Sequence, residues 1–200
     1  MFSINLENSS CASVRWRAKH LSEKFVELRH NKNERLSCLS VASGHIRELG
    51  YVHNAEQVFD QFVALDQDAI SNTEARISHP YDFLQIVDKS ISYIIRDGFK
   101  NQKFDFVYSA GLFDYLNEKV AAKLVNKLYD SVEEDGELLI ANFAKGTLER
   151  AYMDIFMDWK LIYRDEEETL EIARLAGIPS DKITLYRDPM MKVIYMRMEK

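Results

Sequence analysis

The first thirty residues carry apolar side chains at alternating steps of four and three along an otherwise polar segment. These positions are Val14, Ala18, Leu21, Phe25 and Leu28. Such spacing places them on one face of an α-helix, and Ser9 or Ser10 can cap its N-terminus. The pattern therefore predicts an N-terminal helical segment over residues 1–33, with one buried face.

Beyond residue 36, short apolar runs alternate with helix-length stretches of mixed polarity. The apolar runs are at 39–42, 62–65, 83–87, 104–108 and 137–143. The stretches between them predict helices that begin near His45, at 68–77, at 91–96 and after the capping residue Asn117. Strands that alternate with helices are typical of a parallel sheet covered on both faces.

The C-terminal part departs from this alternation. A helix is predicted to start at Asp165, with Glu168 in the position of a capping box, and to end at Gly177. Two further apolar runs, 182–186 and 193–198, flank a turn at 187–189 and predict a hairpin. The expected fold is thus α/β, with a seven-stranded sheet of five parallel strands and a hairpin that makes the last strand antiparallel.

Composition narrows the classes of function. The chain has 200 residues and a net charge of −6, which argues against a general nucleic-acid binder. Its two cysteines, Cys11 and Cys38, do not belong to a Cys/His cluster, so no metal site is expected. The sequence shows neither a signal-peptide pattern nor an apolar run long enough to cross a bilayer. We therefore expect a soluble, cytoplasmic protein.

The first two predicted strands end on residues that suit a nucleoside. Ligands of such sheets bind at the carboxyl ends of the strands. Gly44 would let the backbone approach a ligand closely, and the helix expected after it could face an anionic group. Asp66, after the second strand, could accept hydrogen bonds from both ribose hydroxyls. The alternative is an ordinary turn at Gly44 and a helix cap at Asp66.

Four segments resemble one enzyme family in their order and spacing. They are VASGHIREL, FVALDQD, FDFVYSAGLFDYL and SVEEDGELLIANF, and they resemble the class I S-adenosylmethionine-dependent methyltransferases. Segments 104–116 and 151–168 are similar to a bacterial subgroup that includes enzymes thought to make methyl esters of 3-hydroxy fatty acids. The family usually has an acidic residue and two or three glycines in the first turn, where this chain has Ser40, Ala42 and one glycine.

The resemblance implies a Rossmann-like fold, S-adenosylmethionine as the cofactor, and methyl transfer to a small acceptor. The cofactor residues that it implies are Ala42, Ser43, Gly44, Asp66, Gln67, Ser90, Ile91, Ser109, Ala110 and Gly111. Residues 42–44 would wrap the methionine part, Asp66 would hold the ribose, and Gln67 would lie beside the adenine. Ser90 and Ile91 would flank the adenine, and residues 109–111 would line the wall near the sulfonium. Arg17 or Arg47 could pair with the cofactor carboxylate or form surface ion pairs.

A sulfonium methyl is already activated, so the protein mainly has to position the acceptor and exclude water. A hydroxyl acceptor would benefit from a base, for which the candidates are Asp114, Tyr115 and His45; a carboxylate acceptor needs none. The alternatives are that His45 begins a helix and that Asp114 orients its loop.

The acceptor pocket is expected to come from the N-terminal helix and residues 144–165. Candidate acceptor-binding residues in this stretch are Tyr152, Trp159, Tyr163 and Arg164. Arg164 could meet an acidic acceptor or neutralise Asp165, and the aromatic residues could instead belong to the core. The chain would then be a single domain over 1–200, with a cofactor-binding half at 34–143 and acceptor-side helices with the hairpin at 144–200.

Two other functions remain open from the sequence. A non-catalytic module of the same fold could serve as a partner-binding subunit or a nucleoside sensor. A nicotinamide-dependent oxidoreductase is disfavoured, because only Gly44 remains of the GxGxxG fingerprint. The sequence does not indicate the acceptor or the oligomeric state.

Overall fold

The computed structural model describes residues 9–99, 102–146, 150, 153, 155 and 158–200. Within them, seven strands form one sheet in the order β3-β2-β1-β4-β5-β7-β6. The strands are β1 (Leu36–Val41), β2 (Phe59–Asp66), β3 (Leu84–Asp88), β4 (Phe104–Ser109), β5 (Val132–Phe143), β6 (Ile183–Arg187) and β7 (Val193–Glu199). Neighbours among β1–β5 pair in parallel, whereas β7 is antiparallel to both β5 and β6. The predicted sheet is confirmed.

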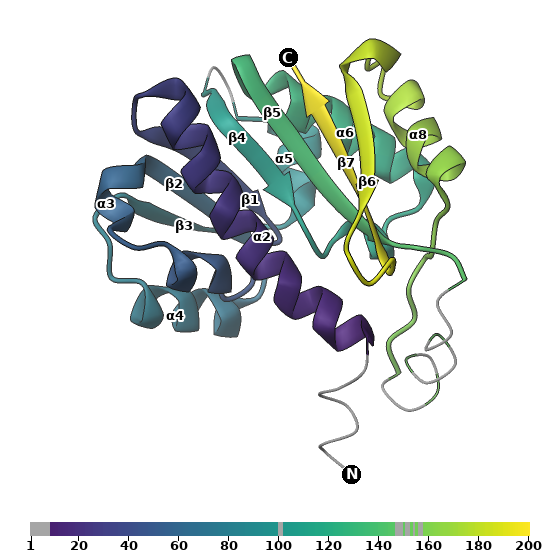
Figure 1. The fold of residues 1–200 in the computed structure, drawn as a ribbon, viewed down its shortest axis with the longest axis horizontal. Helices are drawn as coiled ribbons and strands as arrows, with labels where there is room; N and C mark the ends of the chain where they lie inside the picture. Colours follow the sequence, from purple (N-terminus) through teal and green to yellow (C-terminus); the bar gives the residue numbers. More distant parts are fainter. Residues whose placement is uncertain (1–8, 100–101, 147–149, 151–152, 154, 156–157) are drawn as a thin grey trace.

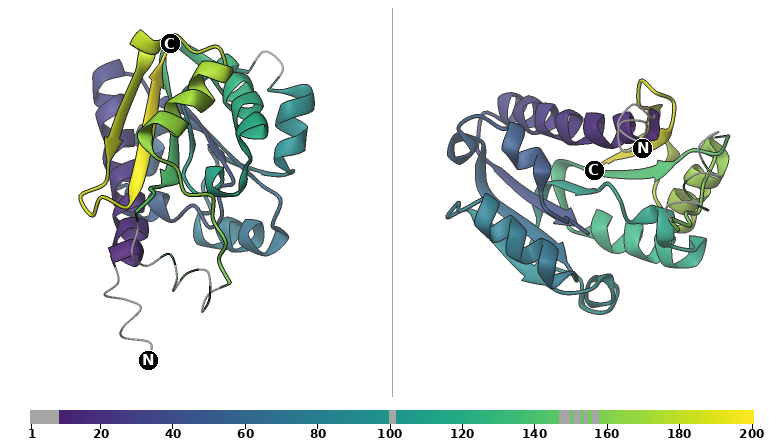
Figure 2. Two further views of the ribbon diagram at one scale, coloured as in Figure 1. Left: turned by 90° about the vertical axis from the view of Figure 1, so that its right-hand side faces the viewer. Right: turned by 90° about the horizontal axis from the view of Figure 1, so that it is seen from below.

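Helices cover both faces of the sheet (Figure 2). The α-helices are α2 (Ser9–Lys32), α3 (Ala55–Val58), α4 (Ala69–Ser78), α5 (Ile91–Asp97), α6 (Glu118–Asp130) and α8 (Glu166–Leu175). Short 3₁₀ helices are η1 (Arg47–Tyr51), η2 (Phe113–Tyr115) and η3 (Ser180–Lys182). One hydrophobic cluster joins the sheet to α2, η1, α3 and α4, and a second joins it to α5, α6 and α8.

Helix α2 packs across β1 and its neighbours through the face that its sequence predicts (Figure 1). Leu21 and Phe25 are buried, and the Phe25 ring makes edge contacts with Phe59, Phe62 and Phe106 at centroid distances of 5.1–5.9 Å. Burial of large apolar side chains contributes roughly 1.5–3 kcal/mol each. This packing holds α2 against the sheet, with the N-terminal half of the helix near the carboxyl ends of the strands (Figure 1).

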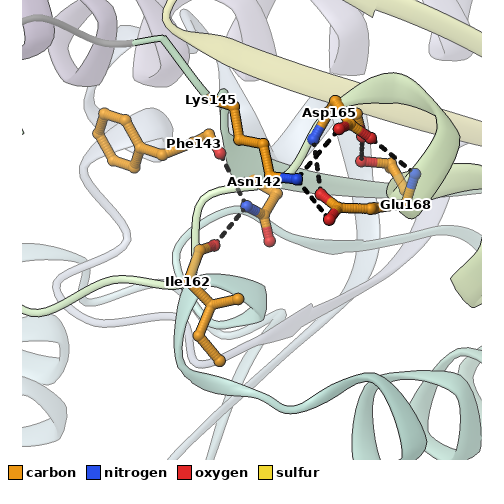
Figure 3. A network of polar contacts seen from close by, with 7 residues as sticks. Asn142, Phe143, Lys145, Ile162, Asp165 and Glu168 are labelled. Atoms are coloured by element: carbon orange, nitrogen blue, oxygen red, sulfur yellow. Dashed lines mark hydrogen bonds and ion pairs between the residues drawn. The ribbon is translucent and has the colours of Figure 1, made fainter.

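Two predicted helix starts are confirmed by their caps. The Asn117 side chain accepts the backbone N–H of Val120 at 3.1 Å, which starts α6. Asp165 and Glu168 form the reciprocal capping box of α8, and Lys145 pairs with both carboxylates (Figure 3). Each cap satisfies backbone donors that the first helical turn leaves unpaired.

The prediction of a helix that begins near His45 is wrong. The segment forms only the 3₁₀ helix η1 and the four-residue helix α3. Ile46 and Asn54, which precede them, have φ values of 51° and 53°. A left-handed residue cannot continue a right-handed helix, so each divides the segment. The expected helix N-terminus that would face an anionic ligand is therefore not formed.

Among the described helices, none has both the length and the apolar composition needed to cross a membrane. Cys11 is half-buried and Cys38 is buried, and both are free thiols.

Candidate functional site

A cavity of about 600 Å³ lies at the carboxyl edge of the sheet, between α2, the turn after β1 and the end of β4. Helix α2 contributes Val14, Arg17, Ala18 and Leu21 to its lining. The other lining residues that bear on function are Ser40, Ala42, Ser43, Gly44, His45, Arg47, Glu48, Tyr108, Ala110 and Gly111. The cavity thus joins the two segments that the sequence placed around a cofactor, and α2 forms one of its walls.

The turn after β1 has a glycine-like backbone although only one of its residues, Gly44, is a glycine. Ala42, Gly44 and Ile46 have φ values of 54°, 55° and 51°. This left-handed region costs an ordinary L-residue about 1–2 kcal/mol. A Cβ added at Gly44 would meet no atom within 4 Å, so the space beside that residue is open.

Asp66 ties the turn after β2 to the turn after β1. Its Oδ2 accepts the Gly44 N–H at 2.8 Å, and its Oδ1 accepts the Asp68 N–H at 2.9 Å. The cap of α4 is Asp68, whose side chain accepts the N–H groups of Ile70 and Ser71. The alternative that Asp66 is the helix cap is therefore wrong.

The predicted adenine-side residues lie at the ends of β2 and β3. Gln67 is exposed, while Ser90 and Ile91 are half-buried at the start of α5. Ser90 is the N-cap residue, without a side-chain capping bond. These three residues do not line the cavity, so the geometry leaves their predicted role untested.

Ser109, Ala110 and Gly111 differ in their orientation. Ser109 is fully buried, and its Oγ donates to the Val41 carbonyl at 2.8 Å. It joins β4 to β1 and does not line the cavity, unlike Ala110 and Gly111. The expectation that all three form the wall is corrected for Ser109, because its hydroxyl is turned to the neighbouring strand.

Arg17 reaches from α2 to the end of β4. Its Nη1 donates to the Ala110 carbonyl, and a Cβ on Gly111 would lie 3.6 Å from that nitrogen. Arg47 also lines the cavity but is exposed, and its Nη2 lies 3.4 Å from Nδ1 of the half-buried His45. Of the two arginines proposed for a cofactor carboxylate, Arg17 is the one fixed inside the site.

Glu48 and Tyr108 form a buried pair that the sequence analysis missed. The Tyr108 hydroxyl donates to Glu48 Oε1, and both side chains line the cavity. Burial raises the pKa of Glu48, against the opposing effects of the Tyr108 hydroxyl and of Arg17. Burial and the nearby Glu48 carboxylate raise the pKa of Tyr108 well above its usual value. Nothing in the sequence separates Glu48 from the many surface glutamates, since its partner lies 60 residues away.

Asp114 holds the loop after β4 against the end of β5. Its Oδ1 accepts the Phe143 N–H at 2.7 Å, and its backbone carbonyl accepts the Ile162 N–H at 2.7 Å. Burial raises the pKa of Asp114 to about 6, although the Phe143 N–H, Arg17 and Arg164 favour the ionised form. The expected loop-orienting role matches this geometry, while a role as a base stays a prediction.

Aromatic residues gather beside this loop. The Trp159 Nε1–H donates to the hydroxyl of the exposed Tyr115, and the Trp159 ring meets Phe143 edge-on at 5.9 Å. Tyr163 is buried, with its hydroxyl 3.7 Å from Met153 Sδ. Tyr152 lies outside the described residues. Tyr115 and Trp159 are thus brought together at the surface, whereas Tyr163 belongs to the core.

Arg164 is buried and bound to the protein itself. Its guanidinium donates to the Phe113 carbonyl at 2.8 Å, to the Leu116 carbonyl and to Asn142 Oδ1. Asn142 Nδ2 in turn donates to the carbonyls of Phe143 and Ile162 at 2.9 Å each (Figure 3).

These contacts correct both expectations for Arg164. The cation that pairs with Asp165 is Lys145. Arg164 lines a separate cavity of about 540 Å³, between the starts of α6 and α8, together with Glu118, Glu167, Glu168 and Glu171. These glutamates repel an acidic acceptor, and the guanidinium is already engaged.

Comparison with known proteins establishes the fold. No protein-family model matches the chain, and no curated protein matches its sequence. Among solved structures, a possible exported protein of Bordetella parapertussis is similar, with a TM-score of 0.70 and 16% identity over 96% of this chain and 69% of that one.

Two methyltransferase structures are also similar. N-methyltransferase NodS from Bradyrhizobium japonicum WM9 has a TM-score of 0.61 at 9% identity, over 91% of this chain and 95% of its own. Magnesium protoporphyrin IX methyltransferase from Synechocystis PCC 6803, solved with bound S-adenosylmethionine, has a TM-score of 0.65 at 11% identity over 94% and 82%. The chain therefore has the Rossmann-like fold of these methyltransferases, with the same arrangement of a parallel sheet and an antiparallel terminal hairpin.

Proposed function

We propose that this protein transfers a methyl group from S-adenosylmethionine to a small, partly apolar acceptor, through a hydroxyl or carboxylate oxygen. The observation that carries the proposal is the cavity at the carboxyl edge of the sheet, which Gly44, Ala110 and Gly111 line. Asp66 does not line the cavity itself, but its carboxylate holds the Gly44 N–H at this edge. The fold supports it, as does the S-adenosylmethionine bound to the magnesium protoporphyrin IX methyltransferase.

The polar groups around the first turn fit such a cofactor. Ser43 lines the cavity, and its Oγ has no hydrogen-bond partner among the described residues. Each Asp66 oxygen accepts one backbone N–H and keeps a lone pair for a ribose hydroxyl. The open side of Gly44 lets a ligand approach the backbone. Donors and acceptors are therefore available where a nucleoside with an amino-acid chain would lie.

The cofactor supplies an electrophilic methyl group, and the protein's residues supply position. Helix α2 forms one wall of the cavity through Val14, Ala18 and Leu21, and these apolar side chains would shield a bound ligand from water on that side. Alignment of two reactants in this way can provide roughly 7–11 kcal/mol of the barrier. The small residues Ala110 and Gly111 let the Arg17 guanidinium lie against the end of β4, where it lines the cavity.

The acceptor would bind beside the loop after β4. Trp159 and Tyr115 offer an aromatic surface there, next to Phe143. An acceptor with an apolar body and one polar head matches this lining, and a 3-hydroxy fatty acid, as the sequence resemblance implies, has both. For a hydroxyl acceptor, Asp114 is the candidate base with a pKa near neutrality.

The test is thermal unfolding with S-adenosylmethionine, S-adenosylhomocysteine and NAD in parallel. A ligand at 100 times its Kd stabilises by about 2.7 kcal/mol. We expect both sulfur nucleosides to raise the Tm and NAD to leave it unchanged. Stabilisation by NAD alone, or by none of the three, would overturn the proposal. Transfer of labelled methyl groups to 3-hydroxy fatty acids then tests the acceptor. Analogues with the 3-hydroxyl already methylated can accept the label only on the carboxylate, so they distinguish the two oxygens.

A further inference from the structure

One carboxylate and three guanidinium groups line the cavity, and two of them, on Glu48 and Arg17, are half-buried or buried. Glu48 is the only carboxylate among the described residues that line it, and Arg17 reaches it from α2. Arg17 is close enough to favour the ionised form of Glu48, yet the described residues show no ion pair within 4 Å between them. Both groups line the same cavity.

The side chain of Glu48 is held in position by Tyr108 on β4. Its Oε1 accepts the Tyr108 hydroxyl, and the Tyr108 ring stacks on Phe106 at a centroid distance of 5.3 Å. The side chain is buried, with the residue 8% exposed. A buried carboxylate is costly unless a cation pairs with it. Among the described residues Glu48 has no such cation within 4 Å, so a cationic group of a ligand could offset the cost of its burial.

Arg17 presents the complementary charge. A guanidinium has five N–H donors in a planar fork that matches a carboxylate. The structure uses Nη1 on the Ala110 carbonyl, which orients the fork over Gly111. The strand that precedes the first turn contributes only Ser40 as a polar group to the lining, and Ser40 lies directly beside Tyr108 in the sheet. Glu48 therefore brings to this end of the cavity an acid that β1 lacks.

We propose that Glu48 and Arg17 together bind an α-amino acid group, with Glu48 on its ammonium and Arg17 on its carboxylate. The inference rests on the proposed function, because the ligand group is then the methionine end of S-adenosylmethionine. It assigns a binding role to Glu48, which reaches the site from η1 rather than from a strand end. Tyr108 acts as the positioning residue that holds the carboxylate in place.

The experiment measures ligand affinity by calorimetry, without turnover. The probes are S-adenosylhomocysteine and 5′-methylthioadenosine, which has the same nucleoside and thioether but no amino-acid end. The variants are Glu48→Gln, which keeps the shape and can still bond Tyr108, and Arg17→Gln. Glu56→Gln in α3 is the matched control, since Glu56 is exposed and does not line the cavity.

We expect each site variant to bind S-adenosylhomocysteine about ten-fold more weakly, which corresponds to the loss of one charge-assisted contact. Binding of 5′-methylthioadenosine should change less than about two-fold on the same reasoning, and Glu56→Gln should alter neither. The wild-type protein should bind the deaminated analogue of S-adenosylhomocysteine about ten-fold more weakly than S-adenosylhomocysteine itself. Glu48→Gln should bind this analogue with nearly the same affinity as the wild-type protein does. Because this comparison changes the ligand of the wild-type protein, it tests the contact with the ammonium even if Glu48→Gln fails to fold.

Three results would overturn the inference. Equal weakening of both nucleosides by Glu48→Gln would mean that Glu48 only shapes the site. An unchanged affinity of the wild-type protein for the deaminated analogue would mean that no residue pairs with the ammonium. If neither nucleoside binds the wild-type protein, the proposed function itself fails, and the inference fails with it.

Discussion

The Asp66 carboxylate accepts the backbone N–H of Gly44 at 2.8 Å, so one side chain joins the turns that follow β1 and β2. This contact holds the first turn at the strand edge, where the cavity opens. It also explains how a turn with a single glycine keeps its shape, because the carboxylate also binds the Asp68 N–H and is fixed from both sides.

Replacement of Asp66 should loosen this junction. In Asp66→Asn the amide nitrogen would face one of the two N–H donors, and the lost bond should lower the free energy of unfolding by about 1–2 kcal/mol. Urea denaturation measures the change. Asp68→Asn is the matched control, because Asn caps a helix as well as Asp does and the loss should stay within about 0.5 kcal/mol. Equal losses in both variants would contradict the role assigned to Asp66.

The left-handed backbone of the first turn predicts that glycine is preferred at Ala42. Ala42→Gly should increase the free energy of unfolding by about 1 kcal/mol, since it removes the steric cost of a Cβ at a φ of 54°. Ile46→Gly should have the opposite effect, because Ile46 is 1% exposed and the loss of its side chain costs about 2 kcal/mol or more. Chemical denaturation of both variants checks the signs, and destabilisation by Ala42→Gly would refute the argument.

Local sequence signals were sufficient for the strands and the helix caps. Asn117 and the Asp165–Glu168 pair act within three residues of each other, so the pattern predicts them directly. The segment after His45 is different. Asn54 is of a residue type that enters the left-handed region, but β-branched Ile46 rarely does, so no local pattern predicts the break at Ile46. Ile46 is buried in the cluster that joins η1 to α2 and the sheet.

The candidate site was predictable only where a backbone feature defined it. Gly44 and Ala110 lie at strand ends, which the strand pattern locates. Glu48 and Arg164 take their roles from partners far away in the sequence: Tyr108 for the first, and the carbonyls of Phe113 and Leu116 for the second. Because no local pattern encodes such partners, Arg164 was assigned to the acceptor, although it holds the fold.

The acid–base behaviour of Asp114 predicts a pH dependence of stability. Its pKa rises from 3.8 to about 6 on burial, so the native state binds the proton more tightly than the unfolded state. Stability should therefore fall as the pH rises from about 4 to 6, by up to about 3 kcal/mol, and then level off. Asp114→Asn should remove this slope and be more stable than the wild-type protein at pH 7. Denaturation curves at several pH values test it, and an unchanged slope in the variant would assign the titration to another group.

The hydrogen bonds of Arg164 predict a large effect on folding. Arg164→Met leaves the Phe113 and Leu116 carbonyls and Asn142 Oδ1 without this donor, which should cost about 3 kcal/mol or more. Arg174→Met is the control, since Arg174 is exposed and pairs with Glu171 on the same helix, and its change should remain within about 0.5 kcal/mol. The Tm of the two variants gives the comparison. Similar Tm values would mean that the buried contacts of Arg164 add nothing to stability.

Substitution of Trp159 offers a test that separates the proposed acceptor binding from cofactor binding. Its ring lies against Phe143 and its Nε1–H donates to Tyr115, outside the cavity assigned to the cofactor. Trp159→Ala should lower kcat/KM for the acceptor at least about ten-fold, because the aromatic surface is lost, and leave the Kd of S-adenosylhomocysteine within about two-fold. Trp159→Phe keeps the edge contact with Phe143 and should recover most of the activity. A parallel loss of cofactor affinity in Trp159→Ala would show that this residue supports the structure of the whole site, and the acceptor would then have to bind elsewhere.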